Sequence, residues 1–262
     1  MAECFLVSSP FQISLDLTPM CQVFIIEGRK NIGLAGTSDS AGEFCMVCCT
    51  GYCAAEAQFN HKVAERDLRR YRRRGADATT GLILGELRRW PLDGRRLLDV
   101  GGGIGIISRE LAGSGVASAT IVEASPAYLE VARREAGSQY GSRPTQFIQG
   151  DFAVIADTLP DADVVTLDRV VCCYPDAEAL LQQAAGRARE LLAFTYPRDR
   201  WYVRTLIALE NLWLRLTGKE FRAFVHPPDR MGAVLEAAGL VRATRRETLV
   251  WTLDLYRRGG DV

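Results

Sequence analysis

The sequence has no excess of charge of either sign and no long hydrophobic run. Its 262 residues carry 32 basic and 32 acidic side chains, so no global attraction to nucleic acid or to an anionic membrane is expected. The purely apolar runs are a few residues long, far below the ~20 residues that a membrane-spanning helix needs. The N-terminal stretch has no early Lys or Arg, and Pro and acidic residues interrupt its apolar parts, which is not the layout of a secretory signal. These absences predict a cytoplasmic protein without a membrane span, and they disfavour nucleic-acid binding outside a local basic patch.

The composition is that of a soluble globular protein, with 48% hydrophobic and 24% charged residues. Residues 1–55 differ from the remainder, because they combine weak periodicity, scattered Gly, Ser, Thr and Pro, and most of the cysteines. We interpret residues 1–55 as a poorly ordered or separately folded extension. Residues 56–262 are then the main domain.

Alternating strands and helices are predicted along most of the chain. Helical propensity and spacing predict two helices between Glu56 and Trp90, the first of which ends at Gly75. The pattern that follows predicts strand 96–100, helix 104–112, strand 118–123, helix 126–136, strand 145–149, a helical turn near 153–157, strand 163–168, helix 176–190, strand 191–196, helices 200–216 and 229–238, and strands 240–246 and 249–256. This alternation predicts an α/β fold with a parallel sheet and helices on both faces. The connection between the last two strands is too short for a crossover, so they should form an antiparallel hairpin at one edge.

The strongest local signal is the glycine loop LLDVGGGIG at residues 97–105. Gly101, Gly103 and Gly105 allow a sharp turn and a close approach to a ligand, and the following helix begins with free N–H groups. Such a loop at the carboxyl end of a strand binds a cofactor in an open α/β sheet. The spacing is GxGxG, with Ile106 where the dinucleotide-binding pattern has its third glycine, and this departure counts against NAD.

Acidic residues lie at the ends of four successive predicted strands: Asp99, Glu123, Asp151 and Asp168. Glu123 follows Gly101 by 22 residues, a position from which a carboxylate accepts hydrogen bonds from ribose hydroxyls. Asp151 and Phe152 are placed to meet an adenine, the first by accepting from its amino group and the second by packing on the ring. Each acid taken alone is equally consistent with a capping or solvated turn residue.

These motifs together resemble the class I S-adenosylmethionine-dependent methyltransferases over about residues 60–256. The resemblance rests on LLDVGGGIG, VEAS, QGDF and VVTLDRVVCCYPD. The chain is also similar to a bacterial subgroup loosely related to magnesium-protoporphyrin O-methyltransferases, through the combination of DLRRYRRRG, DRVVCCYPD and FVHPP. The resemblance implies a Rossmann-like, seven-stranded, mostly parallel sheet, with an antiparallel final strand inserted between two others, and S-adenosylmethionine as cofactor. It also implies that Gly101, Gly103 and Gly105 border the methionine part, Glu123 the ribose, Asp151 and Phe152 the adenine, and Asp168 the amino group and methyl donor; Asp99 completes the cofactor-binding set.

Methyl transfer from a sulfonium depends mainly on aligning donor and acceptor and on excluding water. A base would still help with an oxygen or nitrogen acceptor, and the sequence offers Tyr174 and His226 as candidate catalytic residues. The other interpretation of His226 is a residue that fixes the turn before Pro227 and Pro228. The leading hypothesis is therefore an enzyme that methylates a small molecule.

Two further features leave alternatives open. The arginine run at residues 69–74 either binds an anionic substrate or is a solvated helix face, and through it the chain could instead be a non-catalytic cofactor-binding interaction module. Cys172 and Cys173 beside the predicted site suggest a metalloid or thiol methyltransferase, or else are small apolar residues at a helix start. A second cluster, Cys45, Cys48, Cys49 and Cys53, lacks the separated pairs of a structural zinc site, so no metal is predicted.

Overall fold

The computed structural model describes residues 58–139 and 144–260. The predicted extension of residues 1–55 lies outside the described residues. The cysteine cluster at residues 45–53 lies outside them as well.

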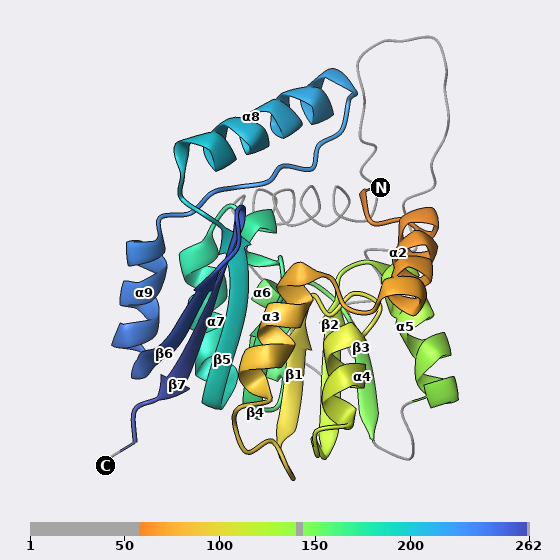
Figure 1. Cartoon of the computed structure of the whole chain (residues 1–262), viewed down its shortest axis with the longest axis vertical. Coiled ribbons are helices and arrows are strands. Elements are labelled where there is room, and N and C mark those ends of the chain that lie inside the picture. Colours follow the sequence, from red (N-terminus) through yellow and green to blue (C-terminus); the bar gives the residue numbers. More distant parts are fainter. Residues whose placement is uncertain (1–57, 140–143, 261–262) are drawn as a thin grey trace, which may run out of the picture. The chain divides into compact units, whose positions relative to one another are not determined.

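A seven-stranded sheet forms the centre of the domain, in the order β3-β2-β1-β4-β5-β7-β6 (Figure 1). The strands are β1 (Arg96–Val100), β2 (Ser118–Glu123), β3 (Thr145–Gln149), β4 (Ala162–Leu167), β5 (Ala188–Pro197), β6 (Leu240–Glu247) and β7 (Trp251–Arg258). Strands β1 to β5 pair in parallel, whereas β7 runs antiparallel to both of its neighbours, β5 and β6. The mostly parallel sheet, the closing hairpin and the inserted final strand are thus confirmed.

Helices connect the strands and precede the first of them. They are α2 (His61–Arg74), α3 (Ala78–Leu87), α4 (Ile106–Ala112), α5 (Pro126–Gln139), α6 (Phe152–Ile155), α7 (Ala177–Arg187), α8 (Trp201–Leu216) and α9 (Pro228–Ala237), with short 3-10 turns η2 (Ala156–Thr158) and η3 (Val171–Cys173). Side chains cap the first two: Asn60 accepts from the Lys62 and Val63 amides, and Asp77 accepts from the Thr80 amide. The two helices predicted before the first strand are therefore present.

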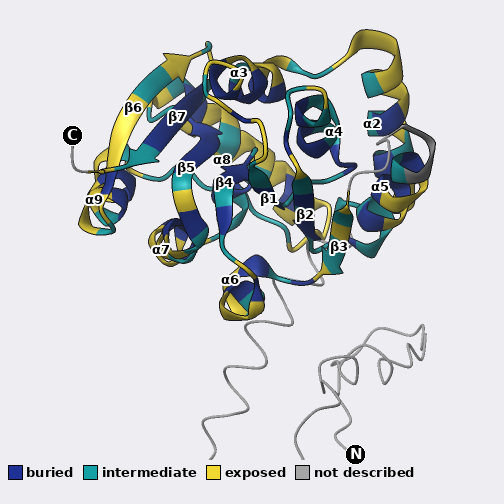
Figure 2. Cartoon of the chain, turned by 90° about the horizontal axis from the view of Figure 1, so that it is seen from below, coloured by how far each residue is buried: buried dark blue, intermediate teal, exposed yellow. Residues whose placement is uncertain are grey.

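Apolar side chains alternate along the strands and divide the core between the two faces of the sheet. Leu97 belongs to a cluster with residues of α3 and α4, whereas Leu98 and Val100 pack in a second cluster with residues of α6, α7 and α9. Figure 2 shows buried central strands and a largely exposed edge strand β6. Helices cover both faces, as the pattern predicted.

Some predicted boundaries were wrong by a few residues, for local reasons. Helix α4 begins at Ile106 and not at residue 104, because Gly105 has a left-handed conformation with φ 77°. Strand β7 begins at Trp251 and not at residue 249, because Thr248 closes a turn by donating its amide to the Trp251 carbonyl over 2.7 Å.

A boundary difference of three residues lies between α7 and β5. Helix 176–190 was predicted, but α7 ends at Arg187 and Ala188 already pairs with Ala162 of β4. The guanidinium of Arg258 donates to the carbonyls of Ala185 and Ala188. This side chain comes from the far end of the chain and binds one carbonyl of the last turn of α7 and the first carbonyl of β5, so local propensity could not predict the stop.

Among residues 58–139 and 144–260, none of the helices combines the length and the hydrophobicity that a membrane span requires.

Candidate cofactor site

The glycine loop has positive φ angles, which residues with a side chain rarely adopt. Gly101, Gly103 and Gly105 have φ values of 60°, 56° and 77°. A Cβ at Gly101 would collide with the side chain of Val170, and one at Gly103 would lie 3.4 Å from the ring of Tyr128. The glycines thus let the loop pass close to neighbouring elements at the carboxyl end of β1.

Glu123, at the end of β2, holds the loop from the neighbouring strand. One carboxylate oxygen accepts from the Gly103 amide at 2.9 Å, and the other accepts from the Ser125 amide at 2.8 Å. Burial raises the pKa of Glu123, although these backbone hydrogen bonds oppose the rise. Both oxygens are therefore fixed in direction and retain lone pairs for a ligand.

Asp99 is a buried acid with half of its carboxyl group unsatisfied. Its Oδ1 accepts from Thr166 Oγ1 at 2.7 Å, whereas its Oδ2 has no hydrogen-bond partner among the described residues. Burial, with the negative charges of Asp168 and Glu123, raises the pKa of Asp99 to about 7 despite the Thr166 hydrogen bond. A buried acceptor without a partner is costly, and it favours a ligand that brings a donor.

Asp168 follows β4 and is held by hydroxyl groups from two distant elements. Thr80 Oγ1 of α3 donates to one of its carboxylate oxygens at 2.6 Å, and Thr195 Oγ1 of β5 donates to the other at 2.7 Å. Thr195 in turn accepts from the Arg169 amide at 2.8 Å. The carboxylate is consequently oriented by partners that the sequence separates widely.

Arg169 combines an unusual backbone with a charge pair beside Asp168. Its φ is 60°, and it is the one non-glycine residue with positive φ in the part of the chain described. Its guanidinium lies 2.8 Å from Asp77 and 3.8 Å from Asp168. Burial alone would raise the pKa of Asp77, but the Arg169 charge and hydrogen bonds from Thr79 and Thr80 lower it overall.

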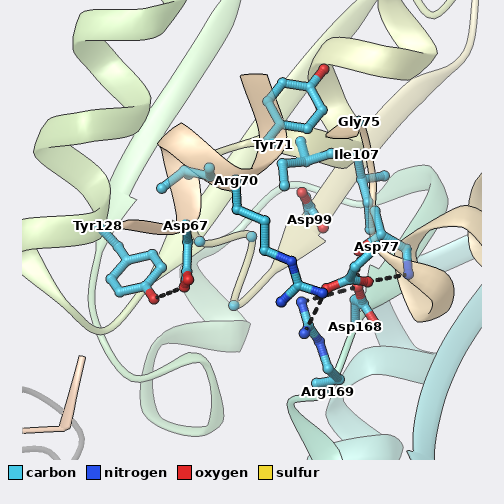
Figure 3. Close-up of a pocket in the computed structure, with 16 residues that line it drawn as sticks. Asp67, Arg70, Tyr71, Gly75, Asp77, Asp99, Ile107, Tyr128, Asp168 and Arg169 are labelled. Carbon is cyan, nitrogen blue, oxygen red and sulfur yellow. Dashed lines mark hydrogen bonds and ion pairs between the residues drawn. The ribbon is translucent and has the colours of Figure 1, made fainter. Parts of the chain in front are cut away.

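The glycine loop, Asp99, Asp168 and Arg169 line one cavity between this loop, α2 and the end of β4 (Figure 3), whereas Glu123 and Gly105 are not among its lining residues. In Figure 3 the side chain of Arg70 extends toward Asp77, Asp168 and Arg169. The lining comprises Asp67, Arg70, Tyr71, Gly75, Asp77, Thr80, Asp99, Gly101, Gly102, Gly103, Ile104, Ile106, Ile107, Tyr128, Asp168 and Arg169. Four residues predicted from the sequence are thereby brought together: Asp99, Gly101, Gly103 and Asp168.

Asp151 and Phe152 do not line this cavity but lie at the end of β3 close to Glu123. Asp151 caps α6 by accepting from the Ala153 amide, and it also accepts from the Tyr174 hydroxyl at 2.6 Å. Phe152 is 2% exposed and packs in the core, so its side chain contributes mainly to stability.

Tyr174 and His226 also lie outside the cavity. Burial, together with the charge of Asp151, raises the pKa of Tyr174, so its hydroxyl holds its proton at neutral pH. The His226 ring nitrogen Nε2 is 2.9 Å from the Tyr174 carbonyl oxygen, and the histidine lines a second depression with Pro175, Asp176 and Arg230. These contacts tie both residues to the segment after β4.

The cysteines after β4 are adjacent but do not face the cavity. Cys172 is buried and its sulfur is 3.9 Å from that of Cys173, and both sulfurs contact the Arg169 carbonyl. No finding supports the metalloid or thiol alternative, nor the interaction module.

Sequence reasoning missed several groups that shape the cavity. Asp77 precedes Thr79 and Thr80 in a pattern typical of a helix start, and this signal was available. Thr166, Thr195 and Arg169 carried no comparable signal, because their roles depend on strand neighbours. Tyr128 likewise meets Asp67 of another helix, donating to it at 2.5 Å.

One family model and several solved structures are similar to this chain. Residues 97–190 match the family model described as a methyltransferase domain. Magnesium protoporphyrin IX methyltransferase from Synechocystis PCC 6803, crystallised with bound SAH, is 19% identical with a TM-score of 0.59, covering 74% of this chain and 95% of that chain. An O-methyltransferase family protein from Burkholderia thailandensis is 18% identical with a TM-score of 0.60, covering 78% of this chain and 62% of that chain. No curated protein matches, and at such low identity the structural matches show the fold alone.

Proposed function

Because residues 97–190 match the family model of a methyltransferase domain, we propose that this protein transfers a methyl group from S-adenosylmethionine to a small-molecule acceptor. The observation that carries the proposal is the unsatisfied, buried oxygen of Asp99 in the cavity beside the glycine loop. S-adenosylmethionine carries an ammonium group at its amino-acid end, which is the donor that such an oxygen lacks.

The residues present fit the other parts of this cofactor as well. Glu123 presents fixed carboxylate oxygens suited to two ribose hydroxyls. Asp151, two residues beyond β3, is placed to accept from the adenine amino group, with Phe152 supporting that edge of the site. Asp168 would face the amino-acid end, because it lines the cavity with Asp99, Gly101 and Gly103, while Gly105 starts the helix behind the loop.

When bound, the cofactor supplies an electrophilic methyl group on a positively charged sulfur. The protein's part is to hold this group in line with the acceptor atom and to keep water away. The carboxylates of Asp99, Asp168 and Glu123 favour a cationic ligand over a neutral one. The ordered hydroxyls of Thr80, Thr166 and Thr195 keep two of these carboxylates in position.

Calorimetric titration with S-adenosylmethionine, and separately with NAD⁺, tests the proposal. We expect micromolar binding of the former and none of the latter, because Ile106 replaces the third glycine of the dinucleotide pattern. A folded protein that fails to bind S-adenosylmethionine would overturn the assignment.

Arg70 is expected to bind the carboxylate at the amino-acid end of the cofactor. Among the arginines at residues 69–74, it alone lines the cavity, and it forms no ion pair with any described residue. Arg70→Ala should weaken S-adenosylmethionine binding about 10-fold, the range of one hydrogen bond to a charged group. Arg73→Ala, three residues further on an exposed part of α2, is the matched control and should bind as the wild type does. Equal effects of the two variants would show that only general positive charge matters.

For Tyr174 and His226 we propose positioning roles near the adenine end. Tyr174→Phe releases Asp151 from its 2.6 Å hydrogen bond, so we expect the dissociation constant for S-adenosylmethionine to rise about 5-fold. His226→Ala should change it less than twofold, because the imidazole meets the backbone carbonyl of Tyr174 and the ring of Phe224, and not the Tyr174 hydroxyl that holds Asp151. The contrary outcome is a lowered kcat with unchanged cofactor affinity and a shifted pH profile, which would identify a general base.

We further propose that the protein is a bacterial, cytoplasmic enzyme. The similarity of its motifs to a bacterial subgroup of methyltransferases supports this source. Fractionation of the native host, with detection of the protein in the soluble cytosolic fraction, tests it.

A further inference from the structure

Helix α8 carries apolar residues on two faces, and the described residues bury only one of them. Val203 and Leu214 are buried against the rest of the described chain. On the other face, large apolar side chains are between 51% and 78% exposed: Trp201, Leu206, Leu209, Leu212, Trp213 and Leu216. Figure 1 shows α8 beyond the carboxyl edge of the sheet, with one long side turned away from it.

The exposed side follows the repeat of a helix that packs on another helix. Residues separated alternately by four and three positions form one stripe, here named the α8 stripe: Tyr202, Leu206, Leu209, Trp213 and Leu216. This spacing keeps apolar side chains on a single line along a helix. Trp201 and Leu212 flank the stripe and widen it.

The exposed apolar area of this face is large for a monomeric protein. Apolar side chains of this size expose on the order of 700 Å² together, above the ~300–600 Å² of the largest patch on a typical monomer. Leu249, also exposed, extends it, because the Tyr202 hydroxyl donates to the Leu249 carbonyl at 2.8 Å. The total approaches the ~800 Å² per partner of a standard protein interface.

The charges around the stripe favour a protein surface over an anionic membrane. A membrane-bound helix needs an excess of Lys and Arg beside its apolar face. Helix α8 itself carries two basic residues, Arg204 and Arg215, and one acidic residue, Glu210. Arg204 is paired with Asp199 at 3.0 Å, and Lys219, after the helix, lies over the Trp213 ring. The ion pair leaves one basic and one acidic side chain on α8, and the whole chain has no net charge. Leu209 lies at the middle of the stripe, with two stripe residues on either side. A second α8 running in the opposite direction would therefore meet the first along its whole length.

We propose that the α8 stripe is the interface of a homodimer, in which α8 of one copy packs antiparallel on α8 of a second copy about a two-fold axis at Leu209. Such an isologous contact uses the same patch on both subunits. It buries the two tryptophans of each helix.

Sedimentation velocity of the full chain over a wide concentration range tests the proposal. We expect a species of twice the chain mass, and Leu209→Glu should raise the dimer dissociation constant at least 100-fold, because two carboxylates would then meet at the axis. Leu209 is exposed in the single chain, so the thermal unfolding midpoint of the monomeric variant should stay close to that of a wild-type monomer. Circular dichroism of both proteins checks that the variant is folded.

Val241→Glu is the matched control, because Val241 is similarly exposed but lies on edge strand β6. It should leave the dimer intact. A wild-type chain that is monomeric throughout would overturn the proposal, as would a dimer that Val241→Glu disrupts and Leu209→Glu does not. Flotation of a monomeric chain with phosphatidylserine vesicles, lost in Leu209→Glu, would assign the stripe to a membrane surface instead.

Discussion

Glu123→Ala is expected to weaken S-adenosylmethionine binding at least 100-fold. The carboxylate of Glu123 is held by the Gly103 and Ser125 amides, so its remaining lone pairs are fixed for the two ribose hydroxyls. Each hydrogen bond to a charged group contributes about 1.5–3 kcal/mol, and two such bonds account for a factor of 100 or more. The substitution also releases the Gly103 amide and with it the middle of the glycine loop. Calorimetric titration measures the affinity directly.

Two further variants serve as controls for this titration. Glu130→Ala removes an exposed acid from α5, and its binding should equal that of the wild type. Glu123→Gln should not restore binding, because one of the two amide donors would face the NH₂ group of the new side chain. If Glu123→Ala unfolds at the wild-type temperature and still binds S-adenosylmethionine with wild-type affinity, the assignment of the ribose site is wrong.

Asp99→Asn is expected to stabilise the ligand-free protein at high pH while it weakens cofactor binding. The Asp99 carboxyl group is 1% exposed and has a pKa of about 7, whereas an unfolded chain ionises it near pH 4. Between these values the folded state keeps a proton that the unfolded state has released, so wild-type stability falls as pH rises toward 7. The amide does not titrate. The stability advantage of the variant should therefore grow by on the order of 2–3 kcal/mol from pH 5 to pH 8.

Denaturant unfolding at pH 5 and pH 8 measures this difference. Asp163→Asn makes the same chemical change at the start of β4, where burial would raise the pKa of the carboxyl group but the amide and guanidinium of Arg96 lower it overall. That control should show no pH-dependent change between pH 5 and pH 8, because its carboxyl group stays ionised throughout. Identical pH dependence for wild type and Asp99→Asn would show that Asp99 does not carry the buried proton.

The same proton links pH to cofactor affinity. Near pH 6 the ligand-free protein holds Asp99 protonated, and binding of a cationic ammonium should displace that proton. Titrations in buffers of different ionisation enthalpy should detect the release in the wild type and not in Asp99→Asn. At pH 8 the variant should bind about 10-fold more weakly, because the charge-assisted hydrogen bond is lost.

The sequence by itself determined the order of the elements and the place of the cofactor loop. Strand and helix periodicity depend on near neighbours, so β1, β2 and β3 were predicted with the bounds that the structure shows. The loop glycines and the acids after the strands were identified for the same reason, since each is a local signal at a strand end. Predicted boundaries were wrong where a distant side chain binds the end of an element, as Arg258 does when it donates to a carbonyl in the last turn of α7.

Only the tertiary structure decided which side chains act together. Asp168 is oriented by Thr80, which lies 88 residues away in the sequence, and by Thr195 on the adjacent strand. Neither contact could be predicted from the spacing of these residues along the chain. Each arginine at residues 69–74 was an equal candidate for binding an anionic group. Helix α2 packs on α5, and of these arginines only Arg70 lines the cavity. Helix α8 was predicted from its periodicity, but which of its apolar faces is buried depends on the domain beneath it. Local signals specify conformation along the chain, whereas contacts between distant residues arise only when the sheet brings the carboxyl ends of its strands to one edge.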